Sequence, residues 1–220
     1  MIAFFVSDME RAAALSRLLS QRRQEVDGPF QLYRGKLRGS PAAVYAVSGN
    51  SDLSYAAAAL AARRGATVLV AIAECSIGEP VAEQVEIAPG AALPVSAIHD
   101  LRALAPLLRL LPNSADVFPL ELGELLPEAA QWTSAVDGVA VGTLPWRCEN
   151  PFLAAALHRE RGIALLDMRL SGYADGAADF GVELRPIAIV SEVLRVGEVI
   201  APVGLQALRN YEELIGAMLG

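Results

Sequence analysis

Short, almost wholly apolar runs separated by segments of helical character constrain the fold of this chain more than any other feature. Ile2–Val6 and residues 67–73 are runs of strand length, typical of strands that are covered on both faces. Residues 7–23, with N-cap candidates at Ser7 and Asp8, and the alanine-rich residues 52–64 favour helices. Strands that alternate with helices predict an α/β fold, a three-layer αβα domain with a central mixed β-sheet.

The remaining segments extend this alternation. Further strands are predicted at residues 30–33, 42–47, 85–87, 139–141, 163–168 and 186–190, and further helices at residues 97–111, Pro151–Arg161 and residues 205–219. Gly35 and residues 39–41 indicate turns, and the irregular residues 112–128 favour neither state. Because no repeat or linker divides the chain, we expect one domain over residues 1–220.

The composition excludes several classes of protein. Hydrophobic residues make up 54% of the 220 residues and charged residues 20%, so the chain has enough apolar surface to bury a core and is not intrinsically disordered. Its net charge of −7 argues against general binding to nucleic acid or to an anionic membrane. Two cysteines, Cys75 and Cys148, are too few for a disulfide framework and indicate reduced thiols.

The mean hydropathy of +0.38 raises the question of a membrane span. The longest apolar stretch, residues 55–73, is interrupted by Arg63 and Arg64, whereas a span needs about 20 mostly apolar residues. The N-terminal apolar run lacks a basic segment before it, which argues against a secretory signal and favours the cytoplasm. With only His99 and His158 beside two cysteines, we expect no metal site, and no glycine-rich motif indicates a nucleotide cofactor.

Polar and aromatic residues gather where the predicted strands end, the place where open α/β sheets bind ligands. The five strand ends are Ser7-Asp8, Glu74-Cys75-Ser76, Thr143-Leu144-Pro145-Trp146, Asp167-Met168-Arg169 and Ser191-Glu192. A carboxylate directly after a buried strand can have a raised pKa and can donate or accept a proton. For Asp8 a helix cap explains the residue better. For Glu192 a catalytic and a solvent-exposed position stay equally open.

The order of these motifs resembles the nucleoside phosphorylase and nucleosidase superfamily, most closely its methylthioadenosine/S-adenosylhomocysteine nucleosidase branch. The similarity rests on five stretches that read IAFFVSDMER, YRGKLRGSPAAVYAVSGNSDLSYAAAAL, ECSIG, GIALLDMR and RPIAIVSEV. In the family they correspond to a strand with a Met-acidic stretch, a hairpin with a Ser-Gly loop, a glycine-rich loop, a strand ending in Glu-Met-Glu and one ending in Ser-Asp. The resemblance covers nearly the whole chain except residues 80–128.

The resemblance implies cleavage of the N-glycosidic bond of a nucleoside, in purine metabolism, without a cofactor. Glu192 stands where the family has the acid that protonates the leaving base. The residues that would bind the substrate are Ser76, Trp146, Asp167, Met168 and Arg169, with Met168 under the sugar and Trp146 stacked on the base. Ser76 and Asp167 belong to the matching strand ends. Trp146 also fits a surface or interface anchor.

Several positions depart from the family pattern: Glu192 replaces an Asp, Glu74 and Cys75 stand in the glycine-rich loop, and two further changes affect the chemistry directly. Ala12 stands at the position where the family has the Glu that activates water. Arg169 replaces the Glu that binds the sugar hydroxyls. Guanidinium has no acceptor, so Arg169 predicts either an anionic ligand or a pairing with Asp167, Glu192 or another carboxylate that closes the pocket. The sequence thus leaves two functions open: a nucleosidase or phosphorylase, acting by hydrolysis or phosphorolysis, and a catalytically degenerate member that serves as a binding or assembly module.

The high apolar content also predicts self-association. Members of the family that this chain resembles build oligomers through helices beside the active site, so we expect a homodimer. The alanine-rich face of residues 54–62 is the candidate surface, since small residues allow helices to approach closely. Packing of the same face on the sheet is the competing explanation.

Overall fold

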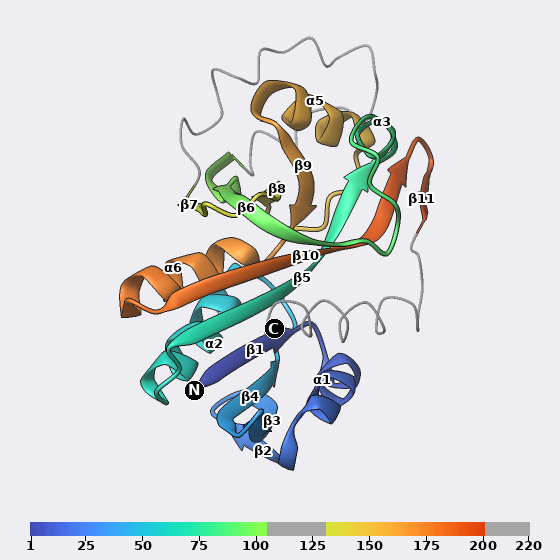
Figure 1. The fold of residues 1–220 in the computed structure, drawn as a ribbon. Coiled ribbons are helices and arrows are strands. Elements are labelled where there is room, and N and C mark those ends of the chain that lie inside the picture. Colours follow the sequence, from blue (N-terminus) through green and yellow to red (C-terminus); the bar gives the residue numbers. More distant parts are fainter. Residues whose placement is uncertain (105–130, 201–220) are drawn as a thin grey trace.

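The protein has an α/β fold in which helices flank one mixed sheet, as seen in a computed structural model that describes residues 1–104 and 131–200 (Figure 1). Within these residues the strands are β1 (Ile2–Val6), β2 (Ser20–Asp27), β3 (Phe30–Leu37), β4 (Ser40–Ala46), β5 (Val68–Gly78), β6 (Ala92–Asp100), β7 (Trp132–Thr133), β8 (Val139–Thr143), β9 (Ile163–Asp167), β10 (Glu183–Arg195) and β11 (Glu198–Ile200). The helices are α1 (Met9–Leu15), α2 (Ser51–Arg63), α3 (Glu79–Gln84), α5 (Pro151–Arg161) and α6 (Leu170–Phe180), with single 3₁₀ turns η1 (Ser16–Leu18) and η2 (Arg102–Leu104). The predicted fold class is confirmed.

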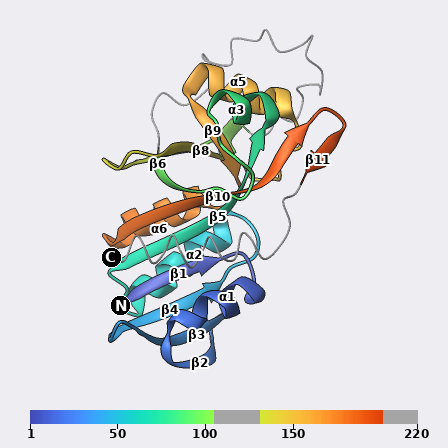
Figure 2. The same ribbon diagram turned by 45° about the vertical axis from the view of Figure 1, so that its right-hand side comes forward.

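The two long strands β5 and β10 join the two parts of the sheet. In the first part, β1 lies between β5 and β4 and is parallel to both, and β3 and β2 continue the sheet as antiparallel strands. In the second part, β6, β8 and β9 connect β10 back to β5. Because β5 and β10 also pair with each other, these five strands close into a ring. Figure 2 shows β5 and β10 extending from one part into the other.

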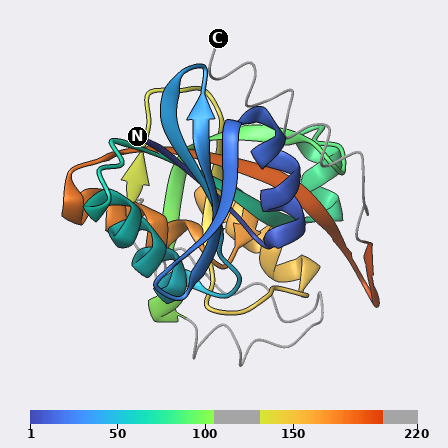
Figure 3. The ribbon, with the colours of Figure 1, turned by 90° about the horizontal axis from the view of Figure 1, so that it is seen from below.

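Alternation along β1 distributes its side chains between the two faces of the sheet. Phe4 and Val6 pack in a cluster with Ala12 and Leu15 of α1. On the other face, Phe5 packs among residues of α2 and α6. Figure 3, viewed along the sheet, shows α1 on one side and α2 with α6 on the other. Burial of β1 on both faces explains why its sequence is continuously apolar.

Helices α2 and α6 lie close together because small residues face each other. A Cβ added at Gly172 would overlap the backbone of Ser51, and one at Gly176 would lie 2.6 Å from the Cβ of Ala58. Ala57, Ala58 and other residues of the face predicted to form a dimer surface are therefore buried inside the chain. The expected homodimer remains a prediction, but the buried alanine face of α2 is not available as the dimer interface.

Several predicted element boundaries were wrong. The helix predicted over residues 7–23 ends at Leu15, because the chain turns through η1 and enters the edge strand β2. Residues 85–87 form no strand, and residues 97–100 belong to β6 rather than to a helix. Gly35 lies inside β3 instead of at a turn. The predicted helix at residues 205–219 lies outside the described residues, as do residues 112–128.

Helix α6 was not predicted. Its apolar side chains Leu170, Tyr173, Ala174 and Ala177 have the spacing of one helix face and are buried, so periodicity was available as a signal. Among the helices of residues 1–104 and 131–200, none has the length and apolar character that a membrane crossing requires.

Candidate ligand-binding site

A cavity of about 300 Å³ lies where β1, β5, β9 and β10 come together. This volume is at the lower end of the range for small-molecule sites. The side chains that line it come from the end of β1, the loop between β4 and α2, β5, the segment before α5, the end of β9, and β10. They are Ser7, Ser48, Gly49, Glu74, Ser76, Arg147, Cys148, Leu166, Asp167, Met168, Arg169, Ser191 and Glu192.

Two of the predicted strand ends are in fact inside longer strands. Glu74, Cys75 and Ser76 lie in β5, which continues to Gly78, so no glycine-rich loop is present there. Ser191 and Glu192 lie in β10, which continues to Arg195. The pairing of β10 with β5 shifts register between Val190 and Glu192. Such an irregularity re-aims side chains, and it lets Ser191 and its neighbour Glu192 both line the cavity.

Glu192 is held at both carboxylate oxygens. Ser76 Oγ donates a hydrogen bond to Oε2 at 3.0 Å, and Arg147 Nε donates to the same oxygen at 3.1 Å. Arg147 Nη2 lies 2.8 Å from Oε1. The side chain of Glu192 is 19% exposed and that of Arg147 is 51% exposed. The acid therefore borders the cavity, while its arginine partner lies largely in solvent and has room to move away.

Asp167 organises the start of α6. Its Oδ1 accepts a hydrogen bond from Thr143 Oγ1 at 2.6 Å, and its Oδ2 accepts from the backbone N–H groups of Arg169 and Leu170, each at 2.8 Å. Burial raises the pKa of the Asp167 carboxyl, and the hydrogen bond from Thr143 opposes this rise. Both oxygens thus have protein donors, so Asp167 positions the residues beside it rather than offering an unused acceptor to a ligand.

Arg169 is buried but has few partners. The residue is 7% exposed, and its Nη1 donates to the backbone carbonyl of Val47 at 3.3 Å. Its backbone N–H binds Asp167, but among residues 1–104 and 131–200 no carboxylate forms an ion pair with its guanidinium. The predicted pairing with Asp167 or Glu192 is therefore not found, because those carboxylates are held by other donors.

The first residue of α2 holds the segment from Met168 to Arg169 in place through a hydrogen bond. Ser51 Oγ donates a hydrogen bond to the Met168 carbonyl oxygen at 3.0 Å and lies 3.0 Å from Ser171 Oγ. Ser51 is the first residue of α2 and lies two residues after Gly49, which lines the cavity together with Ser48. The β4–α2 loop and the β9–α6 connection consequently form one supported rim of the cavity.

The remaining acidic residues near β1 are paired. Glu74 and Asp8 both form ion pairs with Arg11. Asp8 caps α1 by accepting from the Arg11 backbone N–H at 2.9 Å, which fits the helix-cap interpretation. Although burial alone would raise the pKa of Asp8, the hydrogen bonds and charge of Arg11 hold it below its usual value. Ala12 is fully buried in the apolar cluster under α1, so this position has no group that activates water.

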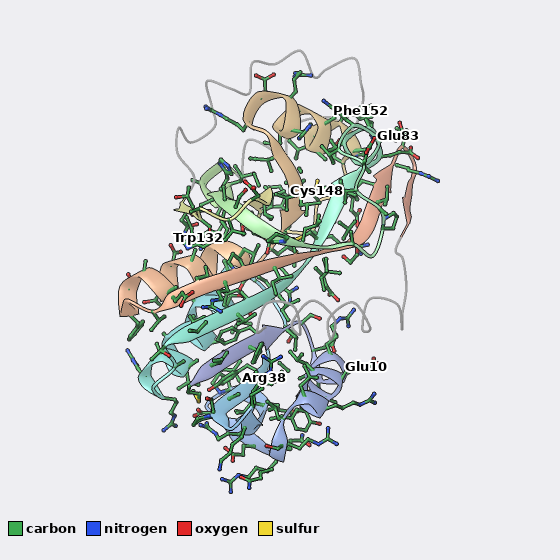
Figure 4. All side chains as sticks on the ribbon, viewed as in Figure 1. Glu10, Arg38, Glu83, Trp132, Cys148 and Phe152 are labelled. Atoms are coloured by element: carbon green, nitrogen blue, oxygen red, sulfur yellow. The ribbon has the colours of Figure 1, made fainter. Side chains whose placement is uncertain are left out.

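The structure brings together most of the predicted site residues. Ser76, Asp167, Met168, Arg169 and Glu192 all line the cavity. Trp146 does not line it but packs against the apolar cluster around Leu144 and Leu153. Cys148, which the sequence indicated only as a reduced thiol, also lines the cavity. Figure 4 shows it near β9, and burial raises the pKa of its thiol to about 11. Within the described part of the chain, no group of side chains is suited to hold a metal ion.

Comparison of the structure with solved structures identifies the fold, whereas comparison of the sequence finds no match. No family model and no curated protein matches the sequence, but many solved structures share the fold. The fold is that of nucleoside phosphorylases and nucleosidases, so the resemblance noted in the sequence is confirmed at the level of the fold.

Three solved structures illustrate the similarity. The 5′-methylthioadenosine/S-adenosylhomocysteine nucleosidase of Neisseria meningitidis, in complex with methylthio-immucillin-A, has a TM-score of 0.65 at 11% identity and covers 86% of this chain and 84% of its own. The purine nucleoside phosphorylase of Toxoplasma gondii, in complex with immucillin-H, has a TM-score of 0.68 at 14% identity, with coverage of 99% and 88%. A mutant futalosine hydrolase of Helicobacter pylori has a TM-score of 0.66 at 11% identity, with coverage of 99% and 94%.

Proposed function

We propose that this protein binds a nucleoside-like small molecule in the cavity and cleaves its N-glycosidic bond. The observation that carries the proposal is the position of Glu192, a partly buried carboxyl group that borders the cavity and is oriented by Ser76 and Arg147. The solved structures with this fold include nucleosidases and a phosphorylase with nucleoside analogues bound, which supports the same class of ligand here.

Glu192 has the role of general acid in this proposal. Cleavage breaks the bond between the sugar carbon and the base nitrogen, and the base leaves more easily when a proton is delivered to it. Ser76 keeps the carboxyl group directed toward the cavity. Arg147 has to release one carboxylate oxygen before Glu192 can carry and transfer a proton, and its exposure to solvent permits this movement.

The nucleophile separates hydrolysis from phosphorolysis. Water needs a base to activate it, and Ala12 provides none. Phosphate is an anion and attacks without such a base, so the proposal favours phosphorolysis. In that reaction a phosphate oxygen forms the new bond to the sugar carbon, the base takes the proton from Glu192, and the products are a sugar 1-phosphate and the free base.

The test is release of base from a panel of purine and pyrimidine nucleosides, measured by chromatography with and without phosphate. We expect release that depends on phosphate. Glu192→Gln keeps the shape and the hydrogen bond with Ser76 but has no proton to transfer, so turnover should fall by about 10²–10⁴-fold. Glu183→Gln, at the opposite end of β10, is the matched control and should retain wild-type turnover. Full turnover by Glu192→Gln would exclude Glu192 as the acid.

A second function, ligand binding without turnover, is favoured by two observations. Ala12 supplies no base, and both oxygens of Glu192 are engaged by neighbouring side chains. This function predicts that no nucleoside in the panel releases base, with or without phosphate, while calorimetry detects saturable binding of a ligand to the wild type. Base release at an ordinary enzymatic rate would eliminate it.

A further inference from the structure

Arg169 has a larger capacity for hydrogen bonding than its surroundings use. A guanidinium group carries five N–H donors and no acceptor. In the part of the chain that the structure describes, its side chain makes one hydrogen bond, from Nη1 to the carbonyl oxygen of Val47. A charged group that is 7% exposed loses much of its hydration, which is costly unless an anion or further acceptors replace the water.

The carboxylates around the cavity do not serve as that anion. Glu192 is bound by Arg147 and Ser76, and Glu74 by Arg11. The third, Asp167, accepts hydrogen bonds from Thr143 and two backbone N–H groups. Asp167 attracts the charge of Arg169, but its oxygens are directed to other donors. Toward the residues that the structure describes, the guanidinium therefore leaves most of its donors unused where it lines the cavity.

The rest of the cavity suits a small oxyanion bound to a polar molecule. Ser48 contributes a hydroxyl group to the lining, and a hydroxyl can donate a hydrogen bond to an oxyanion. The hydroxyls of Ser7, Ser76 and Ser191 also face the cavity, but they already donate to Asp8, Glu192 and the Cys75 carbonyl. Planar guanidinium matches phosphate and carboxylate through two parallel N–H···O bonds. A cavity of about 300 Å³ also limits the ligand to the size of a small molecule.

We propose that Arg169 is an oxyanion-binding residue and that the ligand of this cavity brings a phosphate-type group to it. The group is carried on the sugar of the ligand or is a free phosphate ion bound beside the sugar, and the chemistry that Arg169 recognises is the same in both cases. This inference specifies the ligand of the proposed site and rests on the proposed function only for the class of molecule that carries the anion.

The competing explanation is structural. By binding the Val47 carbonyl, Arg169 connects the β9–α6 segment to the end of β4, and on this explanation the connection holds the rim in place without any ligand. The two explanations differ in what Arg169→Lys and Arg169→Gln do to anion binding. A structural arginine affects folding, whereas an oxyanion-binding arginine affects affinity for phosphate-bearing ligands in a protein that remains folded.

The experiment is calorimetric titration of the folded wild-type chain with four probes: inorganic phosphate, ribose 5-phosphate, adenosine and adenosine 5′-monophosphate. We expect adenosine 5′-monophosphate to bind more tightly than adenosine. Arg169→Gln should weaken each phosphate-bearing probe by at least about 10-fold, the loss of a charge-assisted hydrogen bond, and leave adenosine affinity within about 3-fold. Arg169→Lys, which keeps the charge but not the planar fork, should retain part of the affinity.

Arg185→Gln is the matched control, because it removes one positive charge from the solvent-exposed start of β10 and should leave all affinities unchanged. Circular dichroism and thermal melting establish that each variant is folded. If Arg169→Gln does not fold, the affinities of Arg169→Lys for the phosphate-bearing probes are compared with those of the wild type instead. Tighter binding of ribose 5-phosphate than of inorganic phosphate assigns the group to the sugar, and equal binding assigns it to a free ion; both support the inference.

Equal affinities of wild type and Arg169→Gln for every phosphate-bearing probe would overturn the inference, even in an enzyme that releases base. Loss of phosphate affinity in Arg147→Gln but not in Arg169→Gln would also overturn it, since the anion would then bind at the outer arginine. Conversely, a chain that binds ribose 5-phosphate through Arg169 but cleaves no nucleoside refutes the proposed cleavage and leaves the oxyanion site in place.

Discussion

At the scale of single residues, the buried polar groups of the cavity differ in how completely the protein itself satisfies them. Both carboxylate oxygens of Asp167 accept hydrogen bonds from the protein, whereas the Arg169 guanidinium, two residues later, donates only one to the residues that the structure describes. The sequence placed both at one strand end but did not distinguish their roles. That difference arises from Thr143 on the neighbouring strand β8, a contact that no local pattern encodes.

The role of Asp167 predicts a large effect on stability. Asp167→Ala leaves the Thr143 hydroxyl and the N–H groups of Arg169 and Leu170 without their acceptor and removes the negative charge near a buried arginine. We expect the free energy of unfolding, measured with denaturant, to fall by about 3–5 kcal/mol. Asp137→Ala, at an exposed position, should change it by less than about 0.5 kcal/mol. Equal stability of the two variants would contradict this account of Asp167.

At the scale of elements, the contact of α2 with α6 supports the rim of the cavity. Gly172 lets the start of α6 approach Ser51, and Ser51 in turn binds the Met168 carbonyl. Glycine normally weakens a helix interior, so the close approach explains why glycine is present here. It also explains why α6 escaped prediction, since glycines and aspartates obscure its helical character.

Gly172→Ala tests this contact. Alanine improves helix propensity by about 1 kcal/mol, but its Cβ would overlap backbone atoms of Ser51, so the helices must move apart. We expect a net loss of about 1–3 kcal/mol in the free energy of unfolding. Ala178→Leu adds more volume on the exposed side of the same helix and should have almost no effect. If Gly172→Ala proves more stable than the wild type, the close packing of α2 and α6 is wrong.

Elements with simple local signals were the most predictable. Ile2–Val6 and Pro151–Arg161 were predicted with their observed bounds, the first from its apolar run and the second from its proline at the first turn. The lengths of β5 and β10 were not predictable, because polar residues such as Glu74 and Ser191 look like strand ends. Their strand conformation depends on pairing between segments more than 100 residues apart.

At the scale of the whole molecule, the site forms where the two parts of the sheet meet. β5 and β10 belong to both parts, and the cavity lies beside the register shift in their pairing. The order of polar strand ends along the sequence was sufficient to predict which segments converge, and Glu192, Ser76 and Met168 are found together as expected. The sequence did not predict the ion pair of Glu192 with Arg147 or the exclusion of Trp146, because both depend on the path of the chain before α5.

For the molecule as a whole, we propose that this cavity binds a nucleoside-like ligand with an oxyanion on Arg169. The decisive experiment is a crystal structure of the wild-type protein grown with adenosine 5′-monophosphate and inorganic phosphate together, which covers both sources of the oxyanion. We predict phosphate oxygens within hydrogen-bonding distance of the Arg169 guanidinium, the sugar against Met168, and the remainder of the ligand toward Glu192. A cavity without ligand at saturating concentration, or a ligand bound elsewhere while the Arg169 guanidinium pairs with a carboxylate of the chain, would contradict the claim.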